Sequence, residues 1–191
     1  MNPPIFTALG GTLGIDFVNT VQHHRGQVVD LLDGPDAVSR WLAFMNHTGR
    51  LHTATWCALR PGPWSIERLI EFRRDIRWFL DAKADRQTFL NSLAGAVAEV
   101  PLGFRALHEE DHMTLVAIPS MPGSLGLRSL LAFDWLNLMV SGAVNGVTSC
   151  ANNSCMAYFL DRRGRRKWCS MDTCGNRQKN ARHYARQSGL A

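Results

Sequence analysis

A chain of 191 residues, 46% apolar and 19% charged, can bury a real core, which argues against an intrinsically disordered protein. Its formal charge of +5 is unevenly divided, since residues 150–191 carry nine Lys and Arg against two acids, whereas residues 1–149 carry twelve against fourteen. A near-neutral body with a basic end is the pattern of a chain in which one segment meets a polyanion.

The chain shows no sign of export or membrane insertion. Its first stretch has no basic segment, and Asp16 interrupts the apolar residues there, so we expect no signal peptide. The longest apolar stretch, Leu125 to Val147, contains Arg128 and Asp134 and is too polar for a membrane helix. We therefore expect a cytoplasmic protein with no membrane partner. In that compartment clustered cysteines hold a metal more often than they form disulfides.

Residues 1–149 have mostly helical patterns. The stretch from Asp16 to Val21 is a short apolar helix or a strand end, and its pattern does not separate the two. Asp36 is a good N-cap for a helix that runs to about Asn46.

Longer helices follow. Ser65 can cap a helix over residues 65–84, in which an apolar stripe with a period of about 3.6 residues is interrupted by Arg73 and Arg77. Residues 86–100 form another helix.

The rest of the body combines a hairpin with a long helix. Residues 104–118 alternate on both sides of a polar tip at 109–111, which predicts a β-hairpin. Residues 124–144 form a long apolar helix that leads to Cys150. Cys57 is most simply a small buried hydrophobe.

A group of polar residues stands out near the start: Asp16, Asn19, Thr20 and Arg25. On a helix, Asn19 and Thr20 share the face of Asp16, and Arg25 follows within reach of its carboxylate. The group is either a buried polar network that braces the N-terminal element or a pocket for a small polar effector.

Four of the five cysteines follow the spacing C-x4-C-x13-C-x4-C: Cys150, Cys155, Cys169 and Cys174. Two pairs separated by a loop of this length supply the tetrahedral thiolate ligands that Zn²⁺ prefers. The alternative is four unrelated buried or redox-active cysteines. We predict one structural zinc ion. Because four protein ligands leave no position for a catalytic water, the site does not indicate an enzyme.

The sequence around these pairs predicts a small zinc-bound fold. Residues 156–168 alternate and turn like a β-hairpin around Arg163-Gly164, and residues 175–186 contain no proline and read as a helix. A knuckle, a hairpin and a helix that starts at the last ligands form a treble-clef-like finger.

The finger carries most of the excess charge. On a helix, Lys179, Arg182, His183 and Arg186 fall on one face. Four thiolates and one zinc ion leave about five positive charges, enough for several phosphate contacts. The alternative is a solvated charged face. The predicted nucleic-acid-binding residues are Arg162, Arg163, Arg165, Arg166, Lys167, Arg177, Lys179, Arg182, His183 and Arg186.

The string "RRKWCSMDTCGNRQKNARHYAR" resembles the CGNR zinc finger of bacterial proteins, named for the residues that stand here as Cys174 to Arg177. "LGIDFVNTV" at 13–21, Arg25 and "DGPDAVSRWL" at 33–42 are similar to the ABATE domain that precedes this finger. The resemblance implies a stress-induced regulator of transcription whose finger binds DNA. One departure is "FLDRRGRRKW", which is shorter and more basic than the family's usual hairpin.

Together these patterns predict an α+β protein. Residues 1–146 form a mostly helical domain with a small β-hairpin, which senses a ligand or mediates homo-oligomerisation, and residues 147–191 form the treble-clef-like finger. The leading function is a DNA-binding regulator. Two alternatives remain open, a finger that binds RNA or a protein, and an enzyme with a site around Asp16 and Arg25.

Overall fold

The computed structural model describes residues 5–34, 36–109 and 112–187, without the side chains of 109, 181–183 and 185–186. The helices and strands of this part are, in chain order, α1 (Leu13–Val18), β1 (Val21–His24), β2 (Gln27–Asp30), α2 (Ala37–His47), α3 (Thr53–Leu59), α4 (Ile66–Leu80), α5 (Arg86–Glu99), β3 (Leu102–Glu109), β4 (His112–Pro119), α6 (Gly123–Val140), the 3-10 helix η1 (Ala143–Gly146), β5 (Val147–Ser149), β6 (Tyr158–Leu160), the π-helical turn η2 (Met171–Gly175) and α7 (Asn176–Gln187).

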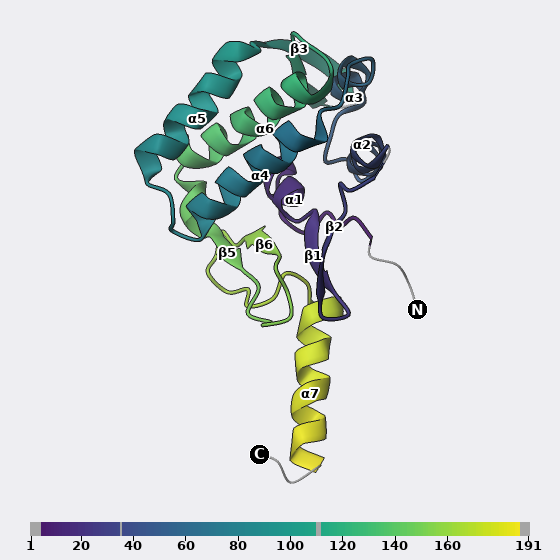
Figure 1. Cartoon of the computed structure of the whole chain (residues 1–191), viewed down its shortest axis with the longest axis vertical. Helices are drawn as coiled ribbons and strands as arrows, with labels where there is room; N and C mark the ends of the chain where they lie inside the picture. Colours follow the sequence, from purple (N-terminus) through teal and green to yellow (C-terminus); the bar gives the residue numbers. More distant parts are fainter. Residues whose placement is uncertain (1–4, 35, 110–111, 188–191) are drawn as a thin grey trace.

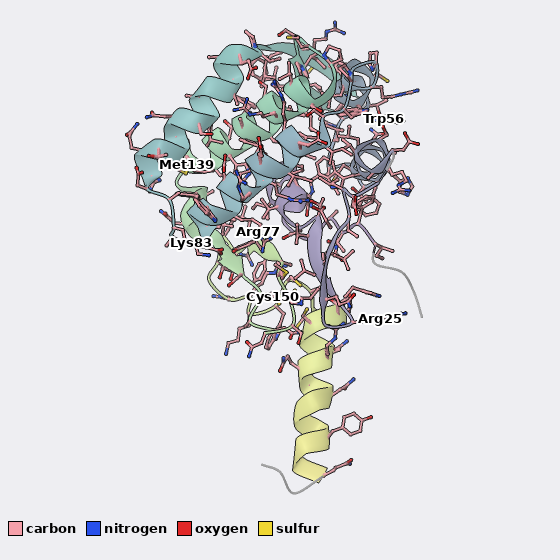
Figure 2. All side chains as sticks on the ribbon, in the orientation of Figure 1. Arg25, Trp56, Arg77, Lys83, Met139 and Cys150 are labelled. Atoms are coloured by element: carbon pink, nitrogen blue, oxygen red, sulfur yellow. The ribbon has the colours of Figure 1, made fainter. Side chains whose placement is uncertain are left out.

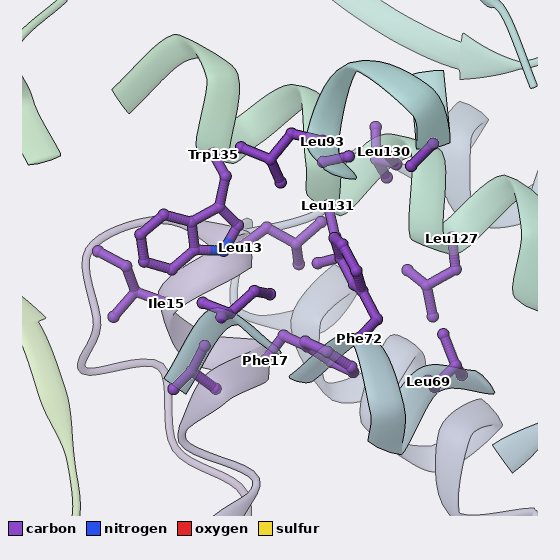
Figure 3. Close-up of a cluster of buried hydrophobic side chains, with 14 of the residues drawn as sticks. Leu13, Ile15, Phe17, Leu69, Phe72, Leu93, Leu127, Leu130, Leu131 and Trp135 are labelled. Carbon is purple, nitrogen blue, oxygen red and sulfur yellow. The ribbon is translucent and has the colours of Figure 1, made fainter. Parts of the chain in front are cut away.

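The body is built around α6, which lies in contact with α1, α4 and α5 (Figure 1). α6 is apolar on nearly all sides because it is covered by these neighbours. Figure 3 shows Trp135 of α6 among apolar side chains from α1 and α5, including Leu13 and Leu93. The three two-stranded antiparallel sheets of the described chain, β1–β2, β3–β4 and β5–β6, lie outside this helical core. The predicted mostly helical α+β class is confirmed.

The predicted helix starts at Asp36 and Ser65 are confirmed in position but not in mechanism. Neither side chain caps its helix: Asp36 has a left-handed backbone with φ of 58°, and the Ser65 hydroxyl instead faces Glu67 at 3.3 Å. Position at a helix start therefore does not by itself produce the capping bond.

Arg73 interrupts the apolar stripe of α4 and is nevertheless buried. Its guanidinium donates to Thr20 Oγ1 at 2.6 Å and forms a two-point ion pair with the Asp30 carboxylate at the end of β2. A buried cation needs such partners, because an unpaired charge in the interior is costly. The residue that breaks the sequence pattern thus attaches the β1–β2 hairpin to the helical core.

The predicted hairpin over residues 104–118 is confirmed as β3 and β4, although 110–111 of its predicted tip lie outside the described residues. The β1–β2 hairpin and α3 were missed. β1 and β2 are only four residues each, and the two residues between them, Arg25 and Gly26, both have positive φ. Alternation over so short a stretch gives little signal for a strand.

Two further expectations are wrong. Cys57 is exposed rather than buried. The strand β6 does not form a hairpin around Arg163-Gly164. It pairs instead with β5, which precedes the first cysteine pair, so the loop that contains Cys150 and Cys155 lies between the two paired strands. The turn at Gly164 exists, but the residues after it form no strand.

The long apolar helix α6 is shorter than predicted, because it ends at Val140 and a 3-10 turn follows before β5. No helix in the described part of the chain is long and apolar enough to cross a lipid bilayer. Apolar side chains form a large cluster in the helical body and a smaller one around the cysteines. A domain boundary at residue 146 stays a prediction.

Candidate zinc site and the basic helix that follows it

The four predicted cysteines converge on one point. The Sγ atoms of Cys150, Cys155, Cys169 and Cys174 all lie within 4.8 Å of one another. The Sγ of Cys169 lies 3.9 Å from that of Cys155 and 3.6 Å from that of Cys174. Tetrahedral Zn²⁺ with bonds of about 2.3 Å places its sulfur ligands about 3.8 Å apart. The separations fit, and these cysteines form a site for one structural zinc ion.

Short-range hydrogen bonds position each pair of ligands. In the first loop, the Cys155 N–H donates to the Asn152 carbonyl at 2.8 Å, and the Ser154 N–H donates to Asn152 Oδ1 at 3.0 Å. In the second, the Gly175 N–H donates to the Ser170 carbonyl at 3.0 Å. These tight turns aim both cysteines of each pair toward the same point.

Without a bound cation, the four thiols cannot all ionise at these distances, because their negative charges would repel one another. A hydrogen bond from the neighbouring Cys169 lowers the pKa of Cys155 to about 5. The same hydrogen bond raises the pKa of Cys169. Burial raises the pKa of Cys174. Crowded thiols share protons in this way because several thiolates repel one another at this distance. A dication bound by all four sulfurs removes that conflict, and its coordination sphere is then closed.

The zinc-binding segment is docked on the body through backbone groups of β6. The side-chain amide of Asn19, at the end of α1, donates to the Tyr158 carbonyl and accepts from the Tyr158 N–H, both at 2.8 Å. Two residues further along β6, the Leu160 N–H donates to the Gly10 carbonyl at 2.7 Å. A Cβ on Gly10 would lie 2.6 Å from Ile15 Cγ2 and 2.9 Å from the Asp16 backbone nitrogen, so the loop passes this close to α1 only with glycine at position 10.

The side chain of Tyr158 points into the same junction and strengthens it. Its hydroxyl is hydrogen-bonded to the carboxylate of Asp81, and the Arg77 guanidinium lies 5.1 Å from its ring centroid. Arg77 also donates to the Met156 carbonyl at 3.4 Å; Figure 2 shows it at the end of α4 that faces the finger. Burial raises the pKa of Tyr158 to about 12, so the phenol keeps its proton for this bond. The prediction that the finger is docked rather than loosely tethered is confirmed.

Asp16 is buried and faces Arg50, not Arg25 as expected. Its Oδ1 accepts from the Gly10 N–H at 2.6 Å, and its Oδ2 lies 2.9 Å from Arg50 Nε. Arg50 also donates to the carbonyls of Gly11 and Ala8, at 2.9 and 3.2 Å. Asp16 and Arg50 together hold in place the loop in which the Gly10 carbonyl accepts the hydrogen bond from β6.

The structure does not bring the four predicted pocket residues together. Asn19 is bonded to Tyr158, and Thr20 Oγ1 accepts from Arg73 and donates to the Phe17 carbonyl. Arg25 is exposed at the turn between β1 and β2. Asp16, Asn19 and Thr20 are buried and internally bonded, which fits the reading of a bracing network.

The basic residues of the finger lie in two places. On α7, which extends away from the body in Figure 1, Arg177 and Lys179 are exposed. Arg182, His183 and Arg186 belong to the same helix, but their side chains lie outside the described residues. The turn after β6 presents the exposed residues Arg162, Arg163, Arg165, Arg166 and Lys167.

Arg166 differs from the other cations of that turn. Its guanidinium stacks on the Phe159 ring, 4.4 Å from the centroid, and donates to the Cys169 carbonyl at 2.6 Å. These contacts tie the turn to a zinc ligand, so Arg166 is a brace for the finger. Tyr158, Arg77 and Arg50 were also missed as site residues. Each acts through a partner more than twenty residues away in the sequence, and no local pattern reports such a pair.

Replacing one zinc ligand should unfold the finger. Cys169→Ser should lose the metal and the protection of residues 147–187 from hydrogen exchange, because metal binding supplies the folding free energy of so small a segment. Zinc content and hydrogen-exchange mass spectrometry measure both. Cys57→Ser, at an exposed cysteine, is the matched control and should keep one zinc per chain. Stoichiometric zinc and full protection in Cys169→Ser would refute the site.

Truncating Asn19 should weaken docking while leaving the metal in place. Asn19→Ala leaves the N–H and carbonyl of Tyr158 without their partners, at a cost of about 1–3 kcal/mol. The expected result is faster exchange in β5 and β6 with unchanged zinc content. Asn91→Ala, on the exposed side of α5, serves as control. If β6 exchanged as slowly in Asn19→Ala as in wild type, the docking role would fall to other contacts.

Asp16 should give the protein a characteristic pH dependence. Burial raises the pKa of its carboxyl from 3.8 to about 6. As pH rises between about 4 and 6, the unfolded chain releases this proton and the folded chain keeps it, so stability falls by up to about 3 kcal/mol from this group. Above about pH 7 the carboxyl is ionised in both states and the contribution is constant.

The test is urea unfolding from pH 4 to 7. Asp16→Asn, which cannot titrate, should flatten the fall, whereas Asp75→Asn on an exposed face of α4 should not. Equal pH slopes in wild type and Asp16→Asn would contradict the assignment.

Comparison with protein families agrees with this geometry. Residues 147–187, which include all four cysteines, match the CGNR zinc finger. Residues 11–142 match ABATE, described as "Putative stress-induced transcription regulator". No curated protein matches the chain. Because the second match spans well over half of its length, the chain belongs to the ABATE family and carries a CGNR zinc finger after the ABATE domain.

Proposed function

We propose that this protein is a cytoplasmic, DNA-binding regulator of transcription in which the zinc finger presents α7 to duplex DNA. The observation that carries the proposal is the position of α7. The turn η2, which holds Cys174, leads directly into α7, and the helix leaves the body with Arg177 and Lys179 exposed (Figure 1). Twelve residues give a helix of about 18 Å, a length suited to the major groove. That the finger is a treble clef remains part of this proposal.

The positive charge near the finger supports a phosphate-rich partner. Nine Lys and Arg against two acids lie in residues 150–191, and the metal site removes about two of the excess charges. Cations of this number release counterions from duplex DNA, which makes affinity fall steeply with salt. We assign the exposed turn and α7 to phosphate contacts, and Arg166 to supporting the turn.

RNA is the less favoured partner. Sequence-specific RNA binding commonly stacks bases on exposed aromatic rings. Tyr158 and Phe159 are buried, Trp168 packs on the cysteine cluster, and of these four described aromatic side chains near the basic segment only Tyr184 is exposed, at 67%. A protein partner is the remaining alternative for the finger.

For the ABATE domain we propose self-association ahead of ligand sensing. The β3–β4 register places Phe104, Met113 and Leu115 on one face of the hairpin, where they are 50%, 64% and 70% exposed. Such exposed apolar groups favour contact with another surface. Effector binding at Asp16 is less favoured, because both of its carboxylate oxygens already face internal donors. The same contacts weaken the proposal of an enzyme at this site.

Neutralising α7 should weaken binding to all DNA sequences. The triple variant Lys179→Gln, Arg182→Gln, Arg186→Gln should keep its zinc and reduce the slope of log affinity against log salt by up to about 3, close to one for each lost phosphate contact. The measurement is a salt series on random duplex DNA, single-stranded DNA and structured RNA of equal length.

A charge-matched triple variant on the body, Arg68→Gln, Arg74→Gln, Arg86→Gln, provides the control and should bind as wild type does. Unchanged duplex binding in the α7 variant would move the interface elsewhere. Stronger binding to RNA than to duplex would favour the alternative partner.

A further inference from the structure

An open surface hollow of about 480 Å³ lies where the turn after β6 meets the N-terminal loop of the body. Both sides of the junction contribute to it. Its lining consists of Gly11, Leu160, Asp161, Arg162, Arg163, Arg165 and Arg166, which we call the arginine cup. A cavity of this size falls in the range of about 300–1,000 Å³ that small-molecule sites occupy.

The walls of the arginine cup are held in place before any ligand binds. The Asp161 carboxylate accepts from the backbone N–H groups of Arg163 and Arg166, at 3.1 and 2.6 Å. Gly164 has a φ of 63°, which lets the chain reverse between them. On the body side, the Gly11 carbonyl accepts from Arg50 at 2.9 Å, and Gly11 adds no side chain to the cavity.

The charge of the arginine cup is not neutralised from within. Asp161 is the acidic residue of the cup. Hydrogen bonds from backbone N–H groups lower the pKa of its carboxyl, so it contributes one negative charge against the arginines. Arg166 is bound to Phe159 and Cys169. Arg162, Arg163 and Arg165 are exposed, and no acidic side chain of the described residues pairs with them.

Three guanidinium groups around one cavity select the chemistry of the ligand. A guanidinium presents its N–H groups as a planar fork that matches two oxygens of a phosphate, and such charge-assisted bonds are the stronger ones in proteins. Several cations on a rigid turn require an anion with more than one charge. We propose that the arginine cup binds phosphate groups, with room and charge for at least two of them.

Two sources can supply phosphate groups here, the backbone of duplex DNA and a free small molecule with linked phosphates. A free ligand would touch Gly11 of the body and the turn of the finger at once, and so would bear on the docking junction. This inference deepens the proposed function and rests on its assignment of the turn to phosphate contacts; it adds the hollow beside Gly11 as the place where the phosphate groups bind.

The test is calorimetric titration of the zinc-loaded full chain with inorganic tripolyphosphate at constant ionic strength. We expect one equivalent to bind, and the double variant Arg163→Gln, Arg165→Gln to bind at least about tenfold more weakly, as expected when bonds to a charged group are lost. The double variant Arg74→Gln, Arg86→Gln, at exposed positions of the body, loses the same charge and should bind within about threefold of wild type. Zinc content measured after each titration checks that the ligand has not removed the metal.

Three results would overturn the proposal: no binding by the wild type, equal losses in both double variants, or equally tight binding of citrate. A second titration, with duplex DNA already bound, separates the sources. Displacement of tripolyphosphate identifies the DNA backbone as the occupant, and a ternary complex identifies a free ligand; both outcomes require the arginine cup. Loss of duplex binding in the α7 variant alone bears on the proposed function and leaves this inference intact.

Discussion

The need to bring four sulfur atoms to one metal ion determines how the last part of this chain is organised. Two loops must each turn tightly enough to offer a pair of cysteines, and the second must pass directly into α7. A segment with so few buried apolar residues cannot build a core that is stable by itself, so the metal replaces one. The direction of α7 is therefore set by the zinc ligand Cys174 in the turn η2, which leads directly into the helix.

That small fold gains its position from the body. β6 makes the contacts that dock the finger on the body. Asn19 and Gly10 form hydrogen bonds with its backbone, and Arg77 and Asp81 contact the side chain of Tyr158. The loop that presents Gly10 is in turn held by the buried pair of Asp16 and Arg50. A path of direct contacts thus runs from the ABATE domain to the turn of arginines and the zinc ligands.

The sequence predicted the features that repeat or obey strict chemistry. Cysteine spacing located the metal site because Zn²⁺ accepts few ligand arrangements. Apolar periodicity located α4 because one-sided burial imposes it, and a long apolar stretch located α6. It failed where a residue acts through a distant partner. Arg25 seemed to be the partner of Asp16 because it is near in sequence, whereas the fold supplies Arg50, and the hairpin partner of β6 turned out to be β5, on the other side of the first cysteine pair. Such pairings depend on the complete fold, and local pattern carries no record of them.

The most direct test of this account is hydrogen-exchange mass spectrometry on the full chain before and after zinc is removed by a chelator. If the metal orders the finger and the body folds without it, removing zinc should abolish protection from hydrogen exchange in residues 147–187 and reduce it in the loop around Gly10. The helices α4 and α6 should stay protected. Retained protection in the finger after complete loss of zinc would contradict the structural role of the metal. Simultaneous loss throughout α4 and α6 would contradict a body that folds independently of it.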